Sequence, residues 1–280
     1  MLIGVISLLS CIGAGLTCAL TDAFSKLDWL WLLPVSFAGC FLALSAFYFF
    51  FLWFLCAIVD MEKPQKKDNK FYRVIVNLTA KVATQILLMR VHTKGLDKLP
   101  KEGRFLLVCN HINDLDPVTL LAFLPKAQLA FITKRENSKL FLVGQLMHKI
   151  LCQPINREND REALKTILNC IQILKEDKAS VAVFPEGYTS LDGLLHPFRS
   201  GVFKIAQKAN VPIVVCTLQN TNKPFKNIAK LKPTHVHLHL VDVIPAEELK
   251  GVTAVEIGNR VHKLMADDLG PDLVLPEETT

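Results

Sequence analysis

The sequence NHINDLD places His111 five residues before Asp116, directly after the apolar run Phe105–Cys109. On a continuous helix, five residues rotate the chain by about 500°, so the two side chains would lie about 140° apart and could not pair. Asn113 and Asp114 are turn formers, and a turn between the two residues would let them meet. A histidine whose ring N–H is held by a carboxylate keeps one tautomer and leaves its other nitrogen free as a general base.

The same residues also have a purely structural interpretation. Pro117 suits the first position of a helix, which makes Asp116 the expected N-cap of a helix over Val118–Phe123. The two interpretations are compatible, because a capping carboxylate is held rigidly and can still accept a hydrogen bond from an imidazole. Cys109, two residues before His111, raises the alternative of a cysteine–histidine nucleophile, but its place in an apolar run predicts a core residue.

Two further segments carry polar residues just beyond apolar runs. The sequence FPEG holds Glu186, which could bind substrate hydroxyls, order a site or face water, and Gly187, which permits close backbone approach or a positive φ. The sequence PINR ends in Arg157, whose guanidinium could form two hydrogen bonds with a phosphate or carboxylate. A surface ion pair of Arg157 with Glu158 or Asp160 is the alternative.

Short apolar runs alternate with helical patterns from residue 105 onward. The runs predict strands at Phe105–Cys109, Leu129–Thr133, Ile150–Ile155, Ser180–Phe184, Ile213–Leu218 and Val236–Val241. The helical patterns fall at Val118–Phe123, Leu140–Lys149, Arg161–Lys175, Val202–Ala209 and near Glu247–Met265. This order predicts an α/β fold with a mixed, largely parallel sheet flanked by helices. Ligands of such sheets gather at the carboxyl ends of the strands, where the polar segments above are expected to meet.

Metal chemistry is not indicated. His235, His237 and His239 alternate and so share one face of a predicted strand, but no carboxylate or cysteine is patterned with them. The eight cysteines form no CxxC pair and lie in apolar stretches, as buried free thiols do. We therefore expect no metal and no cofactor.

The first 60 residues differ from the rest in composition. Leu2–Leu20 and Leu30–Val59 carry no charge, and both are long enough to cross a bilayer as helices. A cleaved signal peptide is the alternative for the first run, but a basic segment before it is missing and a second run follows at once. The pair could also form a hairpin held in one leaflet.

Charge predicts the orientation of this membrane segment. Basic residues cluster after Asp60, at Lys63, Lys66, Lys67, Lys70 and Arg73, so the positive-inside rule places the body on the cytoplasmic face, near anionic lipid. The segment Phe71–Arg90 is predicted to form an amphipathic helix, which could lie on the membrane or pack on the core of the body. Its apolar face is expected to contain Val74, Ile75, Leu78, Val82, Ile86 and Met89, and its polar side Arg73, Asn77, Lys81 and Gln85. We expect a membrane segment at 1–60, a basic linker and amphipathic helix at 61–90, a catalytic domain at 91–270 and a loose acidic tail at 271–280.

Taken together, the motifs between Val91 and Val243 resemble the glycerolipid acyltransferases typified by 1-acyl-glycerol-3-phosphate acyltransferases. The matching segments are Asn110-His111 with Asp116 (N-H-x4-D), Ile155-Asn156-Arg157 (a strand ending in arginine), Phe184-Pro185-Glu186-Gly187 (F-P-E-G) and Val211-Pro212-Ile213-Val214-Val215-Cys216 (close to V-P-I-V-P-V). Lys134-Arg135-Glu136 also fits the K-x-E segment of the family. Four such matches in the family's order make the resemblance specific.

Two departures concern the acceptor. Where the family has T-R-S after Glu-Gly, this chain has Tyr188-Thr189-Ser190, so a phosphate-binding arginine is missing there. Arg199, in HPFRSG, could compensate, or the acceptor headgroup could differ. The second motif has Pro154 and Asn156 where the family favours a larger apolar residue and aspartate.

The resemblance implies a membrane-bound enzyme of phospholipid biosynthesis. It would transfer a fatty acyl group from acyl-CoA or acyl-carrier protein to a lysophospholipid hydroxyl, most simply that of 1-acyl-glycerol-3-phosphate; glycerol 3-phosphate or another lysophospholipid is the alternative acceptor, and nucleic acid is not expected as a partner. The implied catalytic residues are His111 as base and Asp116 as its orienting group. The implied substrate-binding residues are Arg157, Lys134, Arg199, Glu186 and Gly187. A thioester or lysolipid hydrolase and a non-catalytic lipid-binding protein are the competing classes.

Overall fold

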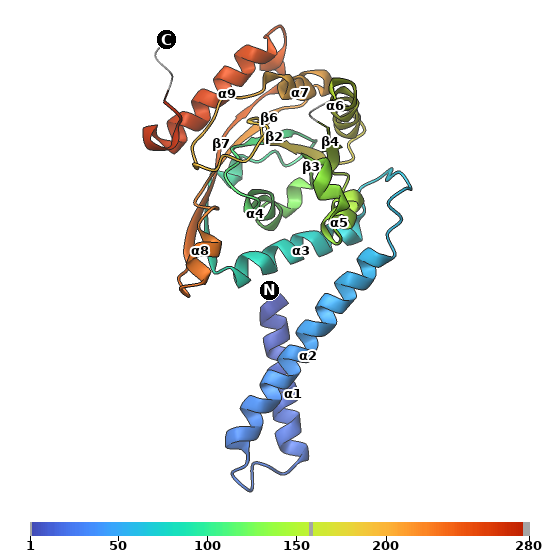
Figure 1. Cartoon of the computed structure of the whole chain (residues 1–280), viewed down its shortest axis with the longest axis vertical. Coiled ribbons are helices and arrows are strands. Elements are labelled where there is room, and N and C mark those ends of the chain that lie inside the picture. The colour runs from blue at the N-terminus through green and yellow to red at the C-terminus, as the bar shows by residue number, and fades with distance from the viewer. Residues whose placement is uncertain (1, 157–158, 277–280) are drawn as a thin grey trace. The chain divides into compact units, whose positions relative to one another are not determined.

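The computed structural model describes residues 2–156 and 159–276, and the chain divides into two compact units with the boundary between Lys63 and Pro64. The first unit consists of α1 (Leu2–Leu20) and α2 (Trp29–Ala57), joined by a short turn and packed on one another (Figure 1). Both helices are long and apolar enough to cross a membrane by length and composition. Their bounds fall within two residues of the two predicted apolar runs.

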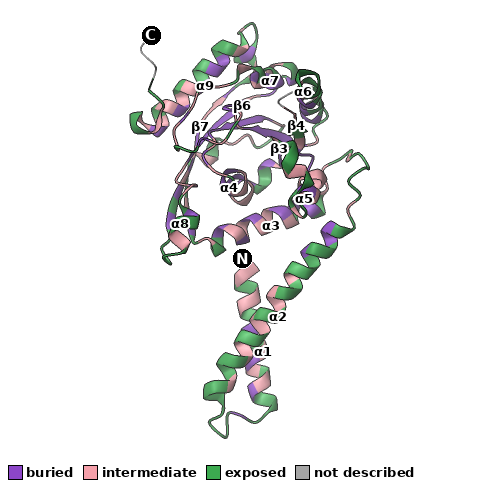
Figure 2. Ribbon diagram, in the orientation of Figure 1, coloured by how far each residue is buried: buried purple, intermediate pink, exposed green. Residues whose placement is uncertain are grey.

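Small residues let the two apolar helices approach closely. Ser10, Ala14 and Cys18, spaced four residues apart, form the buried face of α1. A Cβ atom on Gly13 would lie only 2.9 Å from the sulfur of Cys40 on α2, so a larger residue there would push the helices apart. Most other side chains of both helices face outward (Figure 2), which leaves a surface suited to hydrocarbon rather than water.

The second unit is built on one mixed sheet, and the predicted fold class is confirmed. In the described part of the chain its strands follow the order β1-β7-β6-β2-β5-β3-β4. Their bounds are Met89–Lys94 (β1), Leu106–Cys109 (β2), Leu129–Lys134 (β3), Gln153–Ile155 (β4), Ser180–Val183 (β5), Ile213–Gln219 (β6) and Thr234–Ile244 (β7). All neighbouring pairs run parallel except β6 and β7, which are antiparallel.

Helices cover both faces of this sheet (Figure 1). One face carries α3 (Lys70–Ile86), α4 (Leu115–Phe123) and α5 (Val143–Lys149); the other carries α6 (Asp160–Lys175), α7 (Lys204–Ala209) and α9 (Ala254–Leu269). In β2, Leu106 and Val108 join one core while Leu107 and Cys109 join the other, as side chains that alternate across a strand must. The central strands are therefore buried on both sides, and their carboxyl ends lie along one edge.

Some predicted elements have different bounds. The strand β1 was not predicted, because its sequence MRVHTK alternates polar and apolar residues too weakly. Strand β4 begins only at Gln153, since Ile150 and Leu151 belong to the end of α5 and the turn after it. The last helix begins at Ala254, where Thr253 and Glu256 form a reciprocal capping box.

The helix α3 packs on the core of the unit, which is one of the two predicted alternatives, and its position on a membrane stays a prediction. Its buried face includes Tyr72 and also Arg73, whose guanidinium bonds Asp68 at 2.8 Å and the carbonyls of Leu129 and Ile150. Arg73 was not expected in the core, and it is tolerated there because its donors are paired. Val74, by contrast, was expected on the apolar face and is 63% exposed. The helix therefore packs on the unit and also presents apolar side chains outward.

The segment after α9 is more ordered than the predicted loose tail. Leu195 donates its N–H to the carbonyl of Leu273 at 2.8 Å, and its own carbonyl accepts from Leu275 at 3.1 Å. These bonds hold residues 271–276 against the segment that follows the FPEG motif. Residues 277–280 lie outside the described residues.

Candidate active site

The loop that carries His111 begins where β2 ends, between the ends of β6 and β5. Asn110 continues the ladder between β2 and β6 with its side chain, because its amide accepts from the N–H of Leu218 at 2.8 Å and donates to the carbonyl of Leu218 at 2.9 Å. The N–H of His111 donates to Glu186 at 2.8 Å, and the carbonyl of His111 accepts from the N–H of Ser190 at 2.8 Å. The backbone of the histidine is thus fixed from both sides.

Asp116 is fully buried and accepts hydrogen bonds from four donors. Its Oδ2 lies 2.8 Å from Nδ1 of His111 and accepts from the N–H groups of Ile112 at 2.7 Å and Asn113 at 2.8 Å. Its Oδ1 accepts from the hydroxyl of Thr221, beyond the end of β6. The predicted pairing of His111 with Asp116 across a turn is confirmed.

The predicted helix cap is wrong in its position. The helix begins at Leu115 rather than Val118, and Asp114 occupies the N-cap position without a side-chain cap bond. Asp116 lies inside the first turn, and its carboxylate reaches back to the two N–H groups that precede the helix. The carboxylate therefore stabilises the turn that carries His111 rather than the start of the helix.

The imidazole of His111 is held in one orientation. Its ring stacks on that of Phe184, with centroids 4.1 Å apart and planes 18° apart. Because a carboxylate can only accept, the hydrogen lies on Nδ1 when the ring is neutral, and Nε2 presents a lone pair. The hydroxyl of Thr189 lies 3.0 Å from that Nε2. With 15% of its side chain exposed, His111 is a sheltered base that already faces a hydroxyl group.

Glu186 braces the loops rather than facing solvent. It is 1% exposed, and its two oxygens accept from the N–H of His111 at 2.8 Å and the N–H of His196 at 3.3 Å. Burial raises the pKa of Glu186 to about 8, although these two hydrogen bonds act in the opposite direction. The neutral acid therefore prevails at pH 7.

This buried acid predicts a pH dependence of stability. The proton is bound more tightly in the folded chain, with a pKa of about 8 against 4.5, so the free energy of unfolding should fall as the pH rises between these values, by on the order of a few kcal/mol. Glu186→Gln should flatten this slope, because the amide does not titrate. It should also lower stability by about 1–3 kcal/mol, since an amide NH₂ cannot accept from the second N–H. Denaturant unfolding of both proteins from pH 5 to pH 9 measures the slope, and parallel curves would contradict the assignment.

Gly187 and Arg199 form one contact. Gly187 has a φ of +81°, and a Cβ atom there would lie 2.8 Å from Nε of Arg199, so a larger residue would strain the backbone and displace the arginine side chain. The N–H of Arg199 donates to the carbonyl of Pro185 at 2.8 Å, which ties the arginine to the FPEG segment. The side chain is exposed, and no carboxylate in the part of the chain that the structure describes pairs with it. The arginine is a cation available to a ligand.

Lys134 belongs to one of the outer strands of the same edge. Lys134 is the exposed last residue of β3 and lies in register with Ile155 at the end of β4. Arg157 follows β4 by two residues, but it lies outside the described residues, and so does Glu158, its alternative ion-pair partner. In the strand order, β5 lies between β2, which leads to His111, and β3, which ends in Lys134. Lys134 therefore lies on the same side of His111 as the FPEG segment, which follows β5.

Several residues of the site were not predicted from the sequence. Thr221 was not singled out at all, and Thr189 was noted only as a departure from a motif. The motif FPEG was noted for its glutamate, but its Phe184 forms the platform for the histidine ring. Cys109 is fully buried, and burial raises the pKa of its thiol well above the usual value, so it is a core residue rather than a nucleophile.

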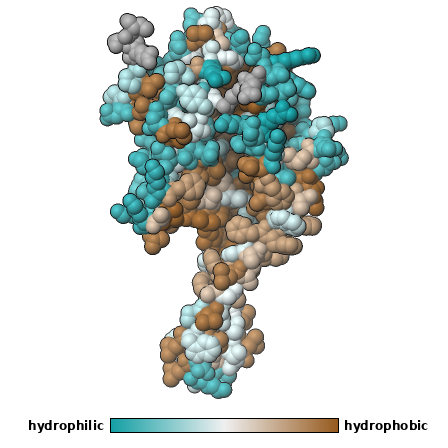
Figure 3. All heavy atoms as spheres, viewed as in Figure 1, coloured by the Kyte–Doolittle hydropathy of each residue, from teal (hydrophilic) through white to brown (hydrophobic). Residues whose placement is uncertain are grey.

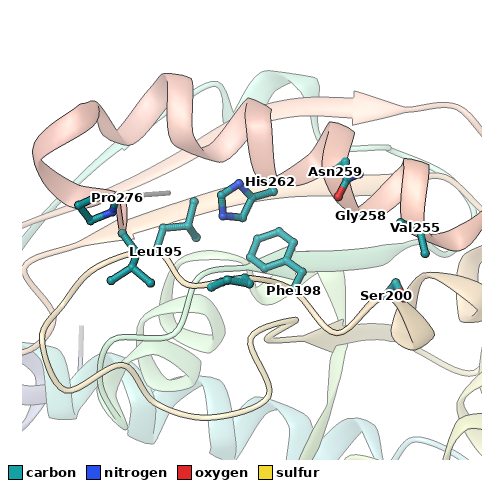
Figure 4. A pocket seen from close by; sticks show the side chains of 10 residues that line it. Leu195, Phe198, Ser200, Val255, Gly258, Asn259, His262 and Pro276 are labelled. Atoms are coloured by element: carbon teal, nitrogen blue, oxygen red, sulfur yellow. The ribbon is translucent and has the colours of Figure 1, made fainter. Parts of the chain in front are cut away.

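A cavity of about 580 Å³ lies on the face of the sheet that α9 covers, between α9 and the segment from Leu195 to Ser200. Figure 4 shows the rings of Phe198 and His262 next to one another in it. They pack edge to face, with centroids 4.8 Å apart and planes 70° apart. His111 and Asp116 do not line this cavity. The candidate catalytic residues therefore lie at the carboxyl ends of the strands, and the cavity is separate from them.

Comparison with known families supports this geometry. The sequence profile of the family described as Acyltransferase matches residues 90–219, which include His111, Asp116 and the FPEG segment. The match covers less than half of the chain, and it makes residues 90–219 similar to an acyltransferase domain. The predicted resemblance to the glycerolipid acyltransferases is confirmed.

Relatives of this acyltransferase domain occur in plants and bacteria. A chloroplast 1-acyl-sn-glycerol-3-phosphate acyltransferase from Brassica napus is 34% identical over 55% of this chain and 44% of its own length, and one from Arabidopsis thaliana is 34% identical over 55% of this chain and 43% of its own. A 1-acyl-sn-glycerol-3-phosphate acyltransferase from Cocos nucifera is 24% identical over 84% of this chain and 75% of its own. The match thus spans less than half the length of the first two relatives.

The fold of the acyltransferase domain has a solved counterpart. The crystal structure of the 1-acyl-sn-glycerophosphate acyltransferase PlsC from Thermotoga maritima superimposes with a TM-score of 0.63 and 24% identity, over 80% of this chain and 87% of that one. At this identity the likeness establishes the shared fold.

Proposed function

We propose that this chain transfers a fatty acyl group from a thioester, either acyl-CoA or acyl-carrier protein, to the free hydroxyl of 1-acyl-glycerol-3-phosphate, giving phosphatidic acid. The observation that carries the proposal is the oriented base. Nδ1 of His111 is held by Asp116, and Nε2 lies 3.0 Å from the hydroxyl of Thr189. Both the family match and the names of the relatives agree with this reaction.

In this mechanism the hydroxyl of Thr189 marks the place of the acceptor hydroxyl, which displaces it on binding. Nε2 of His111 takes the proton as the acceptor oxygen attacks the thioester carbonyl carbon. The carbon–sulfur bond then breaks, and the proton passes from the imidazolium to the departing thiolate. Asp116 orients the ring and stabilises its positive charge, and no covalent enzyme intermediate forms.

The charges around the histidine suit a phosphorylated acceptor. Arg199 lies exposed over Gly187 and could bind the phosphate with two hydrogen bonds in place of the missing motif arginine. Glu186 is neutral at pH 7, so it does not repel the phosphate. Lys134 would add positive charge on the far side of β5. Arg157 follows β4 in the sequence and remains a proposed phosphate ligand through the family resemblance alone.

Arg199→Gln tests this role. Loss of a charge-assisted hydrogen bond of about 1.5–3 kcal/mol should raise the KM for 1-acyl-glycerol-3-phosphate roughly 10-fold to 100-fold, with little change in kcat. Monoacylglycerol, which has the hydroxyl but no phosphate, should be used equally well by variant and wild type. Arg260→Gln, which removes an exposed arginine paired with Glu248, is the matched control. Equal KM values for the phosphorylated acceptor would contradict phosphate binding by Arg199.

The first unit would keep the enzyme at its substrate. Acceptor and product are both lipids, so α1 and α2 are proposed to hold the chain in a membrane, as two spans or as a hairpin in one leaflet. The basic residues after Asp60 favour the cytoplasmic face for the acyltransferase domain.

The decisive experiment supplies labelled acyl thioester with 1-acyl-glycerol-3-phosphate, glycerol 3-phosphate or a zwitterionic lysophospholipid. Preferred formation of phosphatidic acid supports the proposal. Preference for another acceptor would mean that the change to Tyr188-Thr189-Ser190 has altered acceptor choice. Free fatty acid without acylated lipid would favour the hydrolase, in which water takes the place of the acceptor.

A further inference from the structure

The segment that follows β6 leads from the active site to the surface. Thr221 donates its hydroxyl to Asp116, and three residues later α8 (Pro224–Ile228) begins. The segment is well supported, because the side-chain amide of Asn227 donates to the hydroxyl of Thr234 at 2.9 Å and the carbonyl of Asn227 accepts from Lys232 at 3.0 Å. Residues 222–232 together form the α8 segment.

The composition of the α8 segment is unusual for a solvated surface. Phe225 is 58% exposed and Leu231 is 82% exposed, although neither is needed to cover the core. Four exposed lysines surround them, and the sequence from Asn220 to Thr234 contains no acidic residue. The lysines are Lys223, Lys226, Lys230 and Lys232. Apolar side chains that project among lysines, without carboxylates, are typical of a segment at a membrane interface.

The apolar surface continues from the α8 segment onto α3. The N–H of Thr234 donates to the carbonyl of Leu88 at 3.0 Å, which joins the end of the α8 segment to the end of α3. Leu88 is 38% exposed and Ile86 is 53% exposed. In Figure 3, apolar side chains gather along the side of the acyltransferase unit where Figure 1 places α3 and α8.

We propose that the α8 segment, with the adjoining end of α3, docks on an anionic lipid surface and opens the acceptor side of the active site toward that surface. Phe225 and Leu231 would enter the headgroup region, and the lysines would pair with anionic lipids. The inference rests on the membrane placement proposed above. Only 12 residues separate Ala57 at the end of α2 from Lys70 at the start of α3, so a membrane that holds α2 is within reach of α3.

An acidic protein such as an acyl-carrier protein is the rival occupant, since it would also be attracted by the lysines. The contiguous exposed side chains Ile86 and Leu88 favour lipid, because they offer apolar area but no charge to an acidic partner. Docking on lipid also places Thr221, and through it Asp116 and His111, next to the surface from which a lysophospholipid would come.

Hydrogen exchange of the full-length chain in nanodiscs tests the proposal without relying on turnover. Backbone amides of the α8 segment should exchange more slowly in nanodiscs of phosphatidylcholine mixed with phosphatidylglycerol than in phosphatidylcholine alone, and added salt should reverse the difference. Because exchange is measured without substrates, an inactive preparation would refute the acyl transfer and leave this test intact.

Two variants isolate the contributions of charge and apolar contact. Lys226→Glu with Lys230→Glu should weaken docking on the order of tenfold or more and abolish the difference between the two lipids. Phe225→Ser with Leu231→Ser should reduce protection in both lipids, and all four positions are exposed, so folding should be unaffected. Lys175→Glu with Lys250→Glu, two exposed lysines elsewhere on the unit, is the matched control and should behave as wild type.

Two outcomes would overturn the proposal. One is exchange in the α8 segment that is the same in both lipids and in the variants. The other is protection that appears only when an acyl-carrier protein is added, which would assign the surface to a protein partner instead.

Discussion

Replacing His111 with alanine should lower kcat/KM for acyl transfer by about 10²–10⁴-fold, because general-base catalysis typically contributes that much. The loss should appear mainly in kcat, since the imidazole acts on the proton that moves in the transition state. The backbone bonds of His111 to Glu186 and Ser190 do not involve the ring, so the variant should fold. The measurement is the initial rate of transfer from labelled thioester to 1-acyl-glycerol-3-phosphate in mixed micelles.

His92→Ala is a suitable control for this substitution. His92 stacks on His235 and His237 at the β1–β7 side of the sheet, so its removal deletes the same side chain without touching the site. It should leave the rate unchanged. A rate for His111→Ala within a few-fold of wild type, with the thermal unfolding midpoint preserved, would exclude His111 as the base.

The position of the site can be predicted from the sequence. His111 and Glu186 each follow a short apolar run, and the carboxyl ends of parallel strands share one edge, so these residues were expected to meet. The fold satisfies this expectation because β2 and β5 are direct neighbours. The pairing of His111 with Asp116 was predictable for a similar reason, because it depends only on a turn within six residues.

The residues that were not predicted are brought to the site by contacts between segments that lie far apart in the sequence. Thr221 lies 105 residues after Asp116 and reaches it only because β6 pairs with β2, a neighbour relation that apolar runs do not reveal. Glu186 was expected to bind substrate, to order the site or to face water, and both of its oxygens are occupied by backbone N–H groups. A glutamate that braces two loops and one that binds a ligand have the same sequence signature, and its contact with an acceptor stays a prediction.

The exposed faces of helices were equally hard to predict. The spacing of apolar residues in α3 indicates an amphipathic helix, but two sides of this helix are apolar and only one packs inward. Arg73 was assigned to the polar side, yet it is buried because the carbonyls of Leu129, at the start of β3, and Ile150, at the end of α5, supply its partners. Periodicity measures the contrast between faces, so it cannot identify which of two apolar faces meets the core.

The second large effect concerns Asp116, and Asp116→Asn separates its charge from its hydrogen bonds. The asparagine oxygen can occupy the position of Oδ2 and keep accepting from Ile112, Asn113 and Nδ1 of His111. Its amide NH₂ can then donate to Thr221, whose hydroxyl is able to accept. The fold and the tautomer of His111 should therefore persist, while the negative charge that stabilises the imidazolium is lost.

We expect kcat of Asp116→Asn to fall by on the order of 10²–10³-fold, the usual effect of removing one preorganised electrostatic stabiliser, with KM and the unfolding midpoint close to wild type. Asp114→Asn is the matched control, because Asp114 lies in the same turn, is exposed and makes no cap bond, so this variant should be fully active. If Asp116→Asn retained wild-type turnover while His111→Ala lost it, the carboxylate would serve only to hold the turn. The positive charge on the histidine would then have to be stabilised by another group or by solvent, although only 15% of its side chain is exposed.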